Sequence, residues 1–423
     1  MPAPRFALPV ALATWLGAGL AALASLAAPP TSGTAYENGR WFDGEQFVAA
    51  TWYVVDGRLT RQQPDRLSGR VDLAGGHVVP PFAEAHNHNL QNAWGVTRMR
   101  QAYVDQGVMY AAMLCGDPLS TTAAREALGP SPGVDVLFAS ACISSADGHP
   151  LRMARQQPDG SLAPVQDIHD KSYIVMDTVA DIERKWPLVQ AAAPDLVKAI
   201  LVHSERPEHR TDPAMHGING LEPALLAPLV ERAHGAGLRV AVHTESAADF
   251  DVAVQAGVDW ISHLPGYRFW KDRDESDYRL DDASIRLAAE RGIVVIATAN
   301  QAVDAARGDA GALARVQALQ RENLGRLMEA GVQIAIGSDA FGGTSLVEHA
   351  YLRDLQVMDD AALLRALVET TPQLLYPQRK IGRFEEGYEA SFLVLDGDPL
   401  RDPTALSRIR VRVRAGEPMP AQP

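Results

Sequence analysis

The sequence predicts a parallel (β/α)8 barrel with a smaller β domain beside it. The chain has 423 residues, enough for a barrel and a minor domain. Its hydrophobic content of 47% and its charged content of 22% are typical of a globular protein. Short apolar runs, typical of buried strands, alternate with longer stretches whose apolar residues recur every three or four positions. This alternation predicts a parallel sheet covered by helices.

Two stretches carry the helical pattern most clearly. Residues 222–237 have apolar side chains at helical spacing and end in glycine, as helices often do. Residues 312–331 place Leu, Val and Met on one face and Arg, Gln and Glu on the other. Residues 151–172 contain Pro, Gln, Asp and Gly without a period, and we expect an irregular excursion after the third strand there.

Residues of the metal-ligand type follow the apolar runs in order. His86 and His88 lie two positions apart on one predicted strand, so both side chains face the same way. Such a pair can hold one divalent cation, with Zn²⁺ favoured by the ligand type. Because the chemistry of a parallel barrel collects at the C-terminal ends of its strands, we expect the whole set to meet in one site. The set is His86, His88, Lys198, His243, His263 and Asp339.

Each member of this set has a structural explanation when it is taken singly. A histidine at a strand end is often only hydrogen-bonded, and Gly337-Ser-Asp339 also suits a turn or a helix N-cap. Lys198 lies inside an apolar run, where a bare cation is costly, so it requires a partner or a modification. His203 and Glu205 are alternatives to Lys198, because a shift of one residue would reverse which side chains face inward. The ordered set, rather than any one member, favours a metal site.

This ordered set resembles the amidohydrolase superfamily of metal-dependent hydrolases, from about residue 35 onward. The imidazolonepropionase-like and prolidase-like (Xaa-Pro dipeptidase-like) branch shares the Asp-x-x-Lys strand that contains Lys198. Pro81, Glu84 and Ser391 depart from the family pattern without removing a ligand, so the substrate cannot be taken from the named relatives. The motifs that carry the resemblance are Pro80–His88, Asp195–Lys198, Gly257–His263, Gly337–Asp339 and Ile381–Pro399.

The resemblance implies a domain arrangement and a metal centre. Residues 35–79 and 383–420 would pair into a small β-sandwich beside a barrel formed by residues 80–382. Lys198 would be carboxylated and would bridge two divalent ions, zinc by ligand type, about 3.5–4 Å apart. One ion would be held by His86, His88 and Asp339, and the other by His243 and His263.

The reaction that the resemblance implies is hydrolysis of an amide, peptide or related carbon–nitrogen bond through a metal-bridging hydroxide. Asp339 would accept a proton from the water and pass it to the leaving group, and the carboxylated Lys198 would complete the catalytic machinery. A mononuclear deaminase or cyclic-amide hydrolase of the same fold is an alternative, although such enzymes typically lack the lysine. A non-catalytic ligand-binding relative is a third interpretation, against which the retention of the whole ligand set counts.

Candidate substrate contacts follow the third and sixth strands. His149 lies in a Gly-His loop that also occurs in the prolidase-like relatives, and Tyr267 follows the sixth strand closely. Asn300, Arg206 and Arg210 are weaker candidates, the arginines because they suit bidentate recognition of a carboxylate. Each of these side chains also suits an ordinary loop or packing role. The expected partner is a small-molecule substrate, such as a dipeptide, an N-acyl amino acid or a similar amide.

The charge balance argues against another class of partner. The net charge is −13, and no cluster of basic residues offers a face for phosphates, so we expect no nucleic acid. A homo-oligomer is left open by the sequence.

Residues 1–28 have the composition of a targeting segment. A short basic start, Met1–Arg5, precedes an apolar run rich in Ala and Leu, and Pro29-Pro30 follows. A cleaved signal peptide is favoured, and an uncleaved N-terminal anchor is the alternative because the run is long. We expect a periplasmic or secreted enzyme that contacts the membrane only if this segment stays attached.

Cys115 and Cys142 lie near the ends of neighbouring predicted strands. Because adjacent strands are about 4.8 Å apart, a disulfide is geometrically feasible. We nevertheless expect free buried cysteines, because a barrel of this size needs no covalent cross-link.

Overall fold

The computed structural model describes residues 31–130, 133–271 and 273–419. The predicted signal peptide or anchor, residues 1–28, lies outside these described residues. Within them, no helix combines the length and the apolarity that crossing a lipid bilayer would require.

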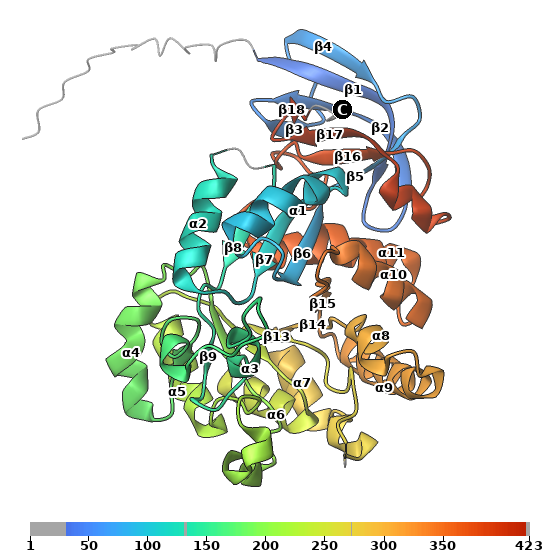
Figure 1. Cartoon of the computed structure of the whole chain (residues 1–423). Helices are drawn as coiled ribbons and strands as arrows, with labels where there is room; N and C mark the ends of the chain where they lie inside the picture. Colours follow the sequence, from blue (N-terminus) through green and yellow to red (C-terminus); the bar gives the residue numbers. More distant parts are fainter. Residues whose placement is uncertain (1–30, 131–132, 272, 420–423) are drawn as a thin grey trace, which may run out of the picture.

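A ring of parallel strands forms the barrel, and helices surround it (Figure 1). Hydrogen bonds close the ring on both sides between its two sheets: the amide of Ala85 donates to the carbonyl of Ile336 at 2.9 Å, and that of Asp195 to the carbonyl of Phe138 at 2.8 Å. The predicted (β/α)8 barrel is thereby confirmed. Among the described residues, the eight barrel strands are β6 (Phe82–Asn87), β7 (Val108–Met113), β8 (Asp135–Phe138), β11 (Val197–Ile200), β12 (Val240–His243), β13 (Trp260–Ser262), β14 (Val294–Ile296) and β15 (Ile334–Ala335). Two further short strands, β9 (Ile143–Ser144) and β10 (Ile174–Val175), pair with each other, and β9 also pairs with β11.

Helices return the chain between the barrel strands. The two predicted helices correspond to α5 (Leu226–His234) and α9 (Ala310–Glu329). The predicted excursion, residues 151–172, is irregular apart from the short helix α3 (Leu151–Ala154) and a 3-10 turn at Val165–Asp167. The other helices are α1 (Ala93–Asp105), α2 (Pro118–Leu128), α4 (Val179–Ala191), α6 (Ala247–Ala256), α7 (Asp282–Glu290), α8 (Gln301–Ala306), α10 (Ser345–Leu355), α11 (Asp360–Arg365) and α12 (Thr371–Leu375).

Apolar side chains fill the barrel and the layer between its strands and helices. Every residue of β6 and β7 is buried. Trp186 of α4, Phe250 of α6 and Trp260 of β13 are fully buried members of one continuous core. Because such a core is close-packed, the strand ends above it are held on a rigid base.

The two terminal segments build the smaller domain together (Figure 1). Its strands form one eight-stranded sheet, in which β5 pairs with β1 in parallel and with β16 antiparallel. Trp41 from the first segment packs against Phe392 from the second, with ring centres 5.2 Å apart, inside a core separate from that of the barrel. The strands are β1 (Ser32–Phe42), β2 (Phe47–Val55), β3 (Arg58–Thr60), β4 (Arg66–Asp72), β5 (His77–Val79), β16 (Phe392–Leu395), β17 (Ile409–Arg414) and β18 (Glu417–Pro418).

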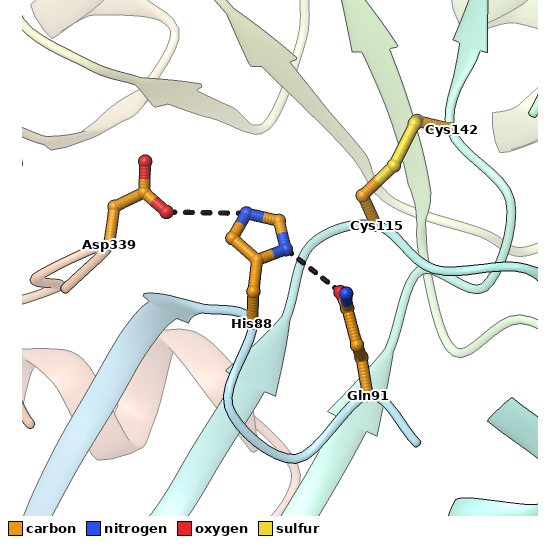
Figure 2. The surroundings of a disulfide bond; sticks show 5 residues. All are labelled: His88, Gln91, Cys115, Cys142 and Asp339. Carbon is orange, nitrogen blue, oxygen red and sulfur yellow. Dashed lines mark hydrogen bonds and ion pairs between the residues drawn. A yellow bond between two sulfur atoms is a disulfide. The ribbon is translucent and has the colours of Figure 1, made fainter. Parts of the chain in front are cut away.

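Cys115 and Cys142 form a disulfide (Figure 2). The expectation of free cysteines was therefore wrong. Cys115 follows β7 and Cys142 follows the neighbouring strand β8, and their Cα atoms are 5.2 Å apart, within the range that a disulfide spans. The cross-link joins the C-terminal ends of two neighbouring strands of the barrel.

Candidate metal centre

The C-terminal ends of four barrel strands bring most of the predicted ligands together. The rings of His243 and His263 are 4.4 Å apart between centres, and those of His86 and His263 are 4.6 Å apart. Oδ1 of Asp339 lies 3.2 Å from Nε2 of His88 and 3.8 Å from Nε2 of His86. These residues form one continuous cluster of imidazoles and a carboxylate.

Lys198 faces the same side of the barrel as this cluster. In the parallel register Ile200 lies beside His243, and Lys198 shares the face of Ile200 because strand side chains alternate. Lys198 is 3% exposed, and within the described residues its Nζ has no hydrogen-bond partner. Burial lowers the pKa of Lys198 to about 7, although the charge of Asp339 acts in the opposite direction. A substantial neutral fraction of this amine is therefore present near neutral pH.

His86, His88 and Asp339 form a compact group of three ligands. Their candidate ligand atoms all lie within 4.8 Å of one another. The amide of Asp339 donates to the carbonyl of His86 at 2.8 Å, which fixes the segment after β15 against β6. Burial alone would raise the pKa of Asp339, but the neighbouring imidazoles and the Lys198 cation hold it below its usual range. The carboxylate therefore stays ionised.

Three of the histidines are held from outside the cluster through one ring nitrogen, and we call the holding residues the outer partners. Each outer partner leaves the other ring nitrogen of its histidine available for an ion, an arrangement common in metal sites. Figure 2 shows His88 between its outer partner and Asp339. The pairs are Nδ1 of His88 with Oε1 of Gln91 at 2.9 Å, Nε2 of His243 with Oε1 of Glu245 at 3.2 Å, and Nδ1 of His263 with Oγ1 of Thr298 at 2.6 Å.

Glu84 holds two segments of the cluster together through hydrogen bonds. Its fully buried carboxylate accepts hydrogen bonds from the amide and the hydroxyl of Ser338, at 2.8 Å and 2.7 Å, and from the amide of His86 at 3.1 Å. Burial raises the pKa of Glu84 to about 7, while these hydrogen bonds act against the rise. The strand that carries His86 is thus tied to the segment that carries Asp339.

The two predicted substrate contacts lie beside the cluster. The ring of His149 stacks on that of His243, with centres 5.5 Å apart. Burial, followed by the nearby His243, lowers the pKa of His149 to about 3, so this imidazole is neutral at physiological pH. The ring of Tyr267 is 5.8 Å from that of His263, but its hydroxyl donates to Glu245 at 2.6 Å. Both substrate roles stay predictions, and Tyr267 could contribute only its oxygen lone pairs while this bond persists.

The alternative candidates have other partners. Nδ1 of His203 lies 3.0 Å from Oε1 of Glu205, and the ring of His203 packs against Trp270 with centres 4.7 Å apart. The two arginines that were candidates for a substrate carboxylate are each neutralised by a glutamate. Their ion pairs are Arg206–Glu208 at 3.2 Å and Arg210–Glu222 at 2.6 Å.

Another buried carboxylate holds the segment that follows β14. Glu348 accepts hydrogen bonds from the amides of Ala299 and Asn300, both at 2.8 Å. Burial raises the pKa of Glu348 to about 8, against the effect of these bonds. The side-chain oxygen of Asn300 is buried and has no hydrogen-bond partner in the part of the chain that the structure describes, so Asn300 stays a candidate contact.

Sequence reasoning did not identify the outer partners. Local signals existed for two of them, because Glu245 follows His243 by two positions and Gln91 follows His88 by three. Thr298 lies 35 positions after His263, and only the pairing of β13 with β14 brings the two side chains together.

The donor set suits divalent metal ions, and His86, His88 and Asp339 form a candidate site for one of them. Imidazoles and carboxylates are the ligands that zinc and related ions take. Burial, and then the neighbouring histidines, lower the pKa of His263, so its ring is a neutral donor. Nζ of Lys198, which has no hydrogen-bond partner in the described part of the chain, lies on the same face, where a carboxylated lysine would add two oxygen ligands.

Comparison with protein families identifies the chain's relatives. Residues 181–417 match the Amidohydrolase family, and the chain belongs to this family. The predicted family, the amidohydrolases, is confirmed, and membership of it supports the predicted enzyme class, a hydrolase acting on carbon–nitrogen bonds. Ochratoxinase from Aspergillus niger is 27% identical over 190 residues, which cover 43% of this chain. The match spans 37% of the length of ochratoxinase, well under two thirds of it.

Solved structures share the whole fold. A Xaa-Pro dipeptidase with bound methionine superposes with a TM-score of 0.72 at 19% identity, covering 92% of this chain and 100% of that chain. Ochratoxinase from A. niger gives a TM-score of 0.69 at 19% identity, covering 92% and 96%. At these identities the likeness supports the fold and does not identify a substrate.

Proposed function

We propose that this chain is an exported, binuclear metal-dependent hydrolase that cleaves an amide, peptide or related carbon–nitrogen bond. The observation that carries the proposal is the buried Nζ of Lys198, which has no hydrogen-bond partner within the described residues and faces the ligand cluster. A bare cation there would repel metal ions, whereas a carboxylated lysine would offer two anionic oxygens to them.

The proposed ligands divide between two ions, with the carboxylated Lys198 between them. When bound, the ions would make hydroxide available at neutral pH and polarise the scissile carbonyl. Zinc is the expected metal by ligand type. One ion would be held by His86, His88 and Asp339, and the other by His243 and His263.

Asp339 is the residue suited to moving the proton. Its carboxylate is held ionised by the neighbouring imidazoles, so it can accept a proton from the attacking water. Transfer of that proton to the leaving nitrogen would let the amine depart. His149, neutral and stacked beside His243, could donate a hydrogen bond to the substrate carbonyl.

Phe341 supports a substrate with an apolar group near the scissile bond. This residue is 76% exposed, and its ring is stacked with that of His88 at 6.2 Å between centres. A ring exposed beside a ligand can gain by covering an apolar substituent of a bound substrate. We therefore favour dipeptides and N-acyl amino acids with apolar side chains, a class consistent with the prolidase-like structural neighbours.

The first test is metal per chain, measured by elemental analysis on protein purified with bicarbonate and zinc. We expect about two ions per chain, falling to one in Lys198→Ala. The same preparations are then assayed on dipeptides and N-acyl amino acids. One ion per chain, with no effect of the substitution, would favour the mononuclear deaminase alternative, and no bound metal would overturn the proposal.

Two observations support export. Residues 1–28 have the composition of a targeting segment, and Cys115 and Cys142 form a disulfide, which persists in oxidising compartments. Fractionation of expressing cells, with cytosolic and periplasmic marker enzymes as controls, tests this. Recovery in the cytosol with both thiols reduced would contradict export.

A further inference from the structure

Glu245 is a buried carboxylate at the centre of a hydrogen-bond network beside the candidate metal centre. It is 4% exposed and follows His243 by two positions. Its oxygens accept hydrogen bonds from three residues of the segment after β13. The donors are the Tyr267 hydroxyl at 2.6 Å, the Trp270 ring N–H at 3.1 Å and the Arg268 guanidinium at 3.2 Å.

The same carboxylate reaches the ring of His243. Its Oε1 lies 3.2 Å from Nε2 of His243. An imidazole that donates through Nε2 keeps Nδ1 unprotonated, and the unprotonated nitrogen is the one that can bind a cation. His149 stacks on the ring of His243, so the ring is fixed by a hydrogen bond at its edge and by packing on its face.

The backbone beneath Glu245 is itself held in place. Asp249 accepts hydrogen bonds from the amides of Glu245 and Ser246 at 2.9 Å and 3.0 Å, and the bond from Ser246 forms part of the capping box at the start of α6. Asp249 also accepts from the amide of His203, which ties in the segment after β11. Glu245 therefore acts from a rigid base.

The outer partners differ in charge. His88 is held by the neutral amide of Gln91 and His263 by the neutral hydroxyl of Thr298, whereas His243 is held by a carboxylate. A carboxylate partner orients a ligating histidine and raises its basicity more than a neutral partner does. The ion next to His243 would therefore depend on Glu245.

We propose that Glu245 is a positioning residue that holds His243 with Nδ1 directed at the second metal ion and ties this ligand to the segment carrying Tyr267. The inference rests on the proposed binuclear function. Glu245 would act through His243, without contact with the ion or the substrate.

The test compares Glu245→Gln with the matched control Glu348→Gln. Both glutamates are buried, but Glu348 accepts from backbone amides and not from a ligand. Metal is titrated into metal-free protein by equilibrium dialysis, with circular dichroism to verify folding. We expect Glu245→Gln to lower the affinity for the second ion, next to His243, by about 10–100-fold while the first ion stays bound. Glu348→Gln should leave both affinities unchanged.

The outcomes separate the two proposals. If the wild-type protein binds two ions and Glu245→Gln binds both with unchanged affinity, the role of Glu245 is wrong and the proposed function stands. If both substitutions weaken the same ion equally, Glu245 has only the structural role of any buried carboxylate. If the wild-type protein binds no pair of ions, both proposals fall.

A second measurement needs no folded variant of Glu245. In metal-free wild-type protein labelled with ¹⁵N-histidine, we expect the His243 ring to carry its proton on Nε2, assigned by comparison with His243→Gln. A proton on Nδ1 instead would overturn the inference, because that nitrogen would then be unable to accept an ion.

Discussion

The two halves of the candidate metal centre differ in how complete they are. On the β6 and β15 side, two imidazoles and the Asp339 carboxylate have their ligand atoms within 4.8 Å of one another. On the β12 and β13 side, His243 and His263 face each other at 4.4 Å between ring centres, and the proposed ligands of this half include no Asp or Glu. In the proposed function, the first half would hold an ion with unmodified side chains alone, whereas the second half would depend on carboxylation of Lys198.

The residues that hold the ligands in place also differ between the two halves. Glu84 fixes the first half through backbone amides, and Gln91 adds a neutral contact to His88. In the second half the charged Glu245 contacts a ligand ring directly. The half formed by His243 and His263 has no carboxylate among its proposed ligands, but the carboxylate of Glu245 contacts the ring of His243 from outside.

The largest effect is expected from Asp339→Asn, which removes the anionic ligand of the complete half. Because Asp339 would serve both as ligand and as proton acceptor, kcat/KM should fall by about 10²–10⁴-fold or more. Steady-state kinetics and metal analysis measure the two losses. An active Asp339→Asn variant that keeps the first ion would contradict both roles assigned to Asp339.

The second prediction concerns pH and the modification of Lys198. Its pKa is lowered to about 7 by burial, so the neutral amine, the form that reacts with carbon dioxide, should predominate above pH 7 and decline below it. Metal-free protein treated with ¹³C-bicarbonate should show a carbamate carbon signal at about pH 8 that is much weaker at about pH 6. Lys198→Ala is the control. A signal that is independent of pH, or present in the control, would contradict the prediction.

A smaller and opposite effect is expected from Gln91→Leu. Removing the amide that holds Nδ1 of His88 should lower the affinity for the first ion by about tenfold and leave that for the second ion unchanged. Glu245→Gln is expected to affect the second ion instead. Competition with a chelator under equilibrium dialysis resolves the two affinities. Equal weakening of both ions would mean that the halves are not separable.

The smallest effect on the metal centre is expected from loss of the disulfide. Figure 2 shows Cys115 and Cys142 near Gln91 and His88, so any change should concern the first half. The Cys115→Ala/Cys142→Ala double variant should lose about 2–4 kcal/mol of unfolding free energy, because the unfolded chain gains freedom. Urea unfolding with and without reductant measures this. Equal midpoints for the wild-type protein in both conditions would show that the disulfide does not form.

The sequence allowed the prediction of what depends on local periodicity. His86 and His88 share a strand face because they lie two positions apart, and the placing of Lys198, rather than His203, beside the cluster follows from the same alternation. These features require no knowledge of neighbouring strands.

Features that depend on side-chain direction across strands could not be predicted. Thr298 meets His263 through the pairing of β13 with β14, and Cys115 meets Cys142 because each follows one of the paired strands β7 and β8. The hydroxyl of Tyr267 points to Glu245, a direction that no spacing in the sequence encodes. Because rotamers are chosen by tertiary packing, such partners become visible only in the folded chain.

The small domain sets an order of events during synthesis. β5 has β1 on one side and β16 on the other, and β16 leaves the ribosome only after the entire barrel has been made. Until then the aromatic side chain of Trp41 lacks Phe392, and one edge of β5 has no partner strand. Pairings between distant segments form late and slowly, and an open strand edge can join a neighbouring chain. Nascent chains should therefore be most prone to aggregation just before the last strands emerge.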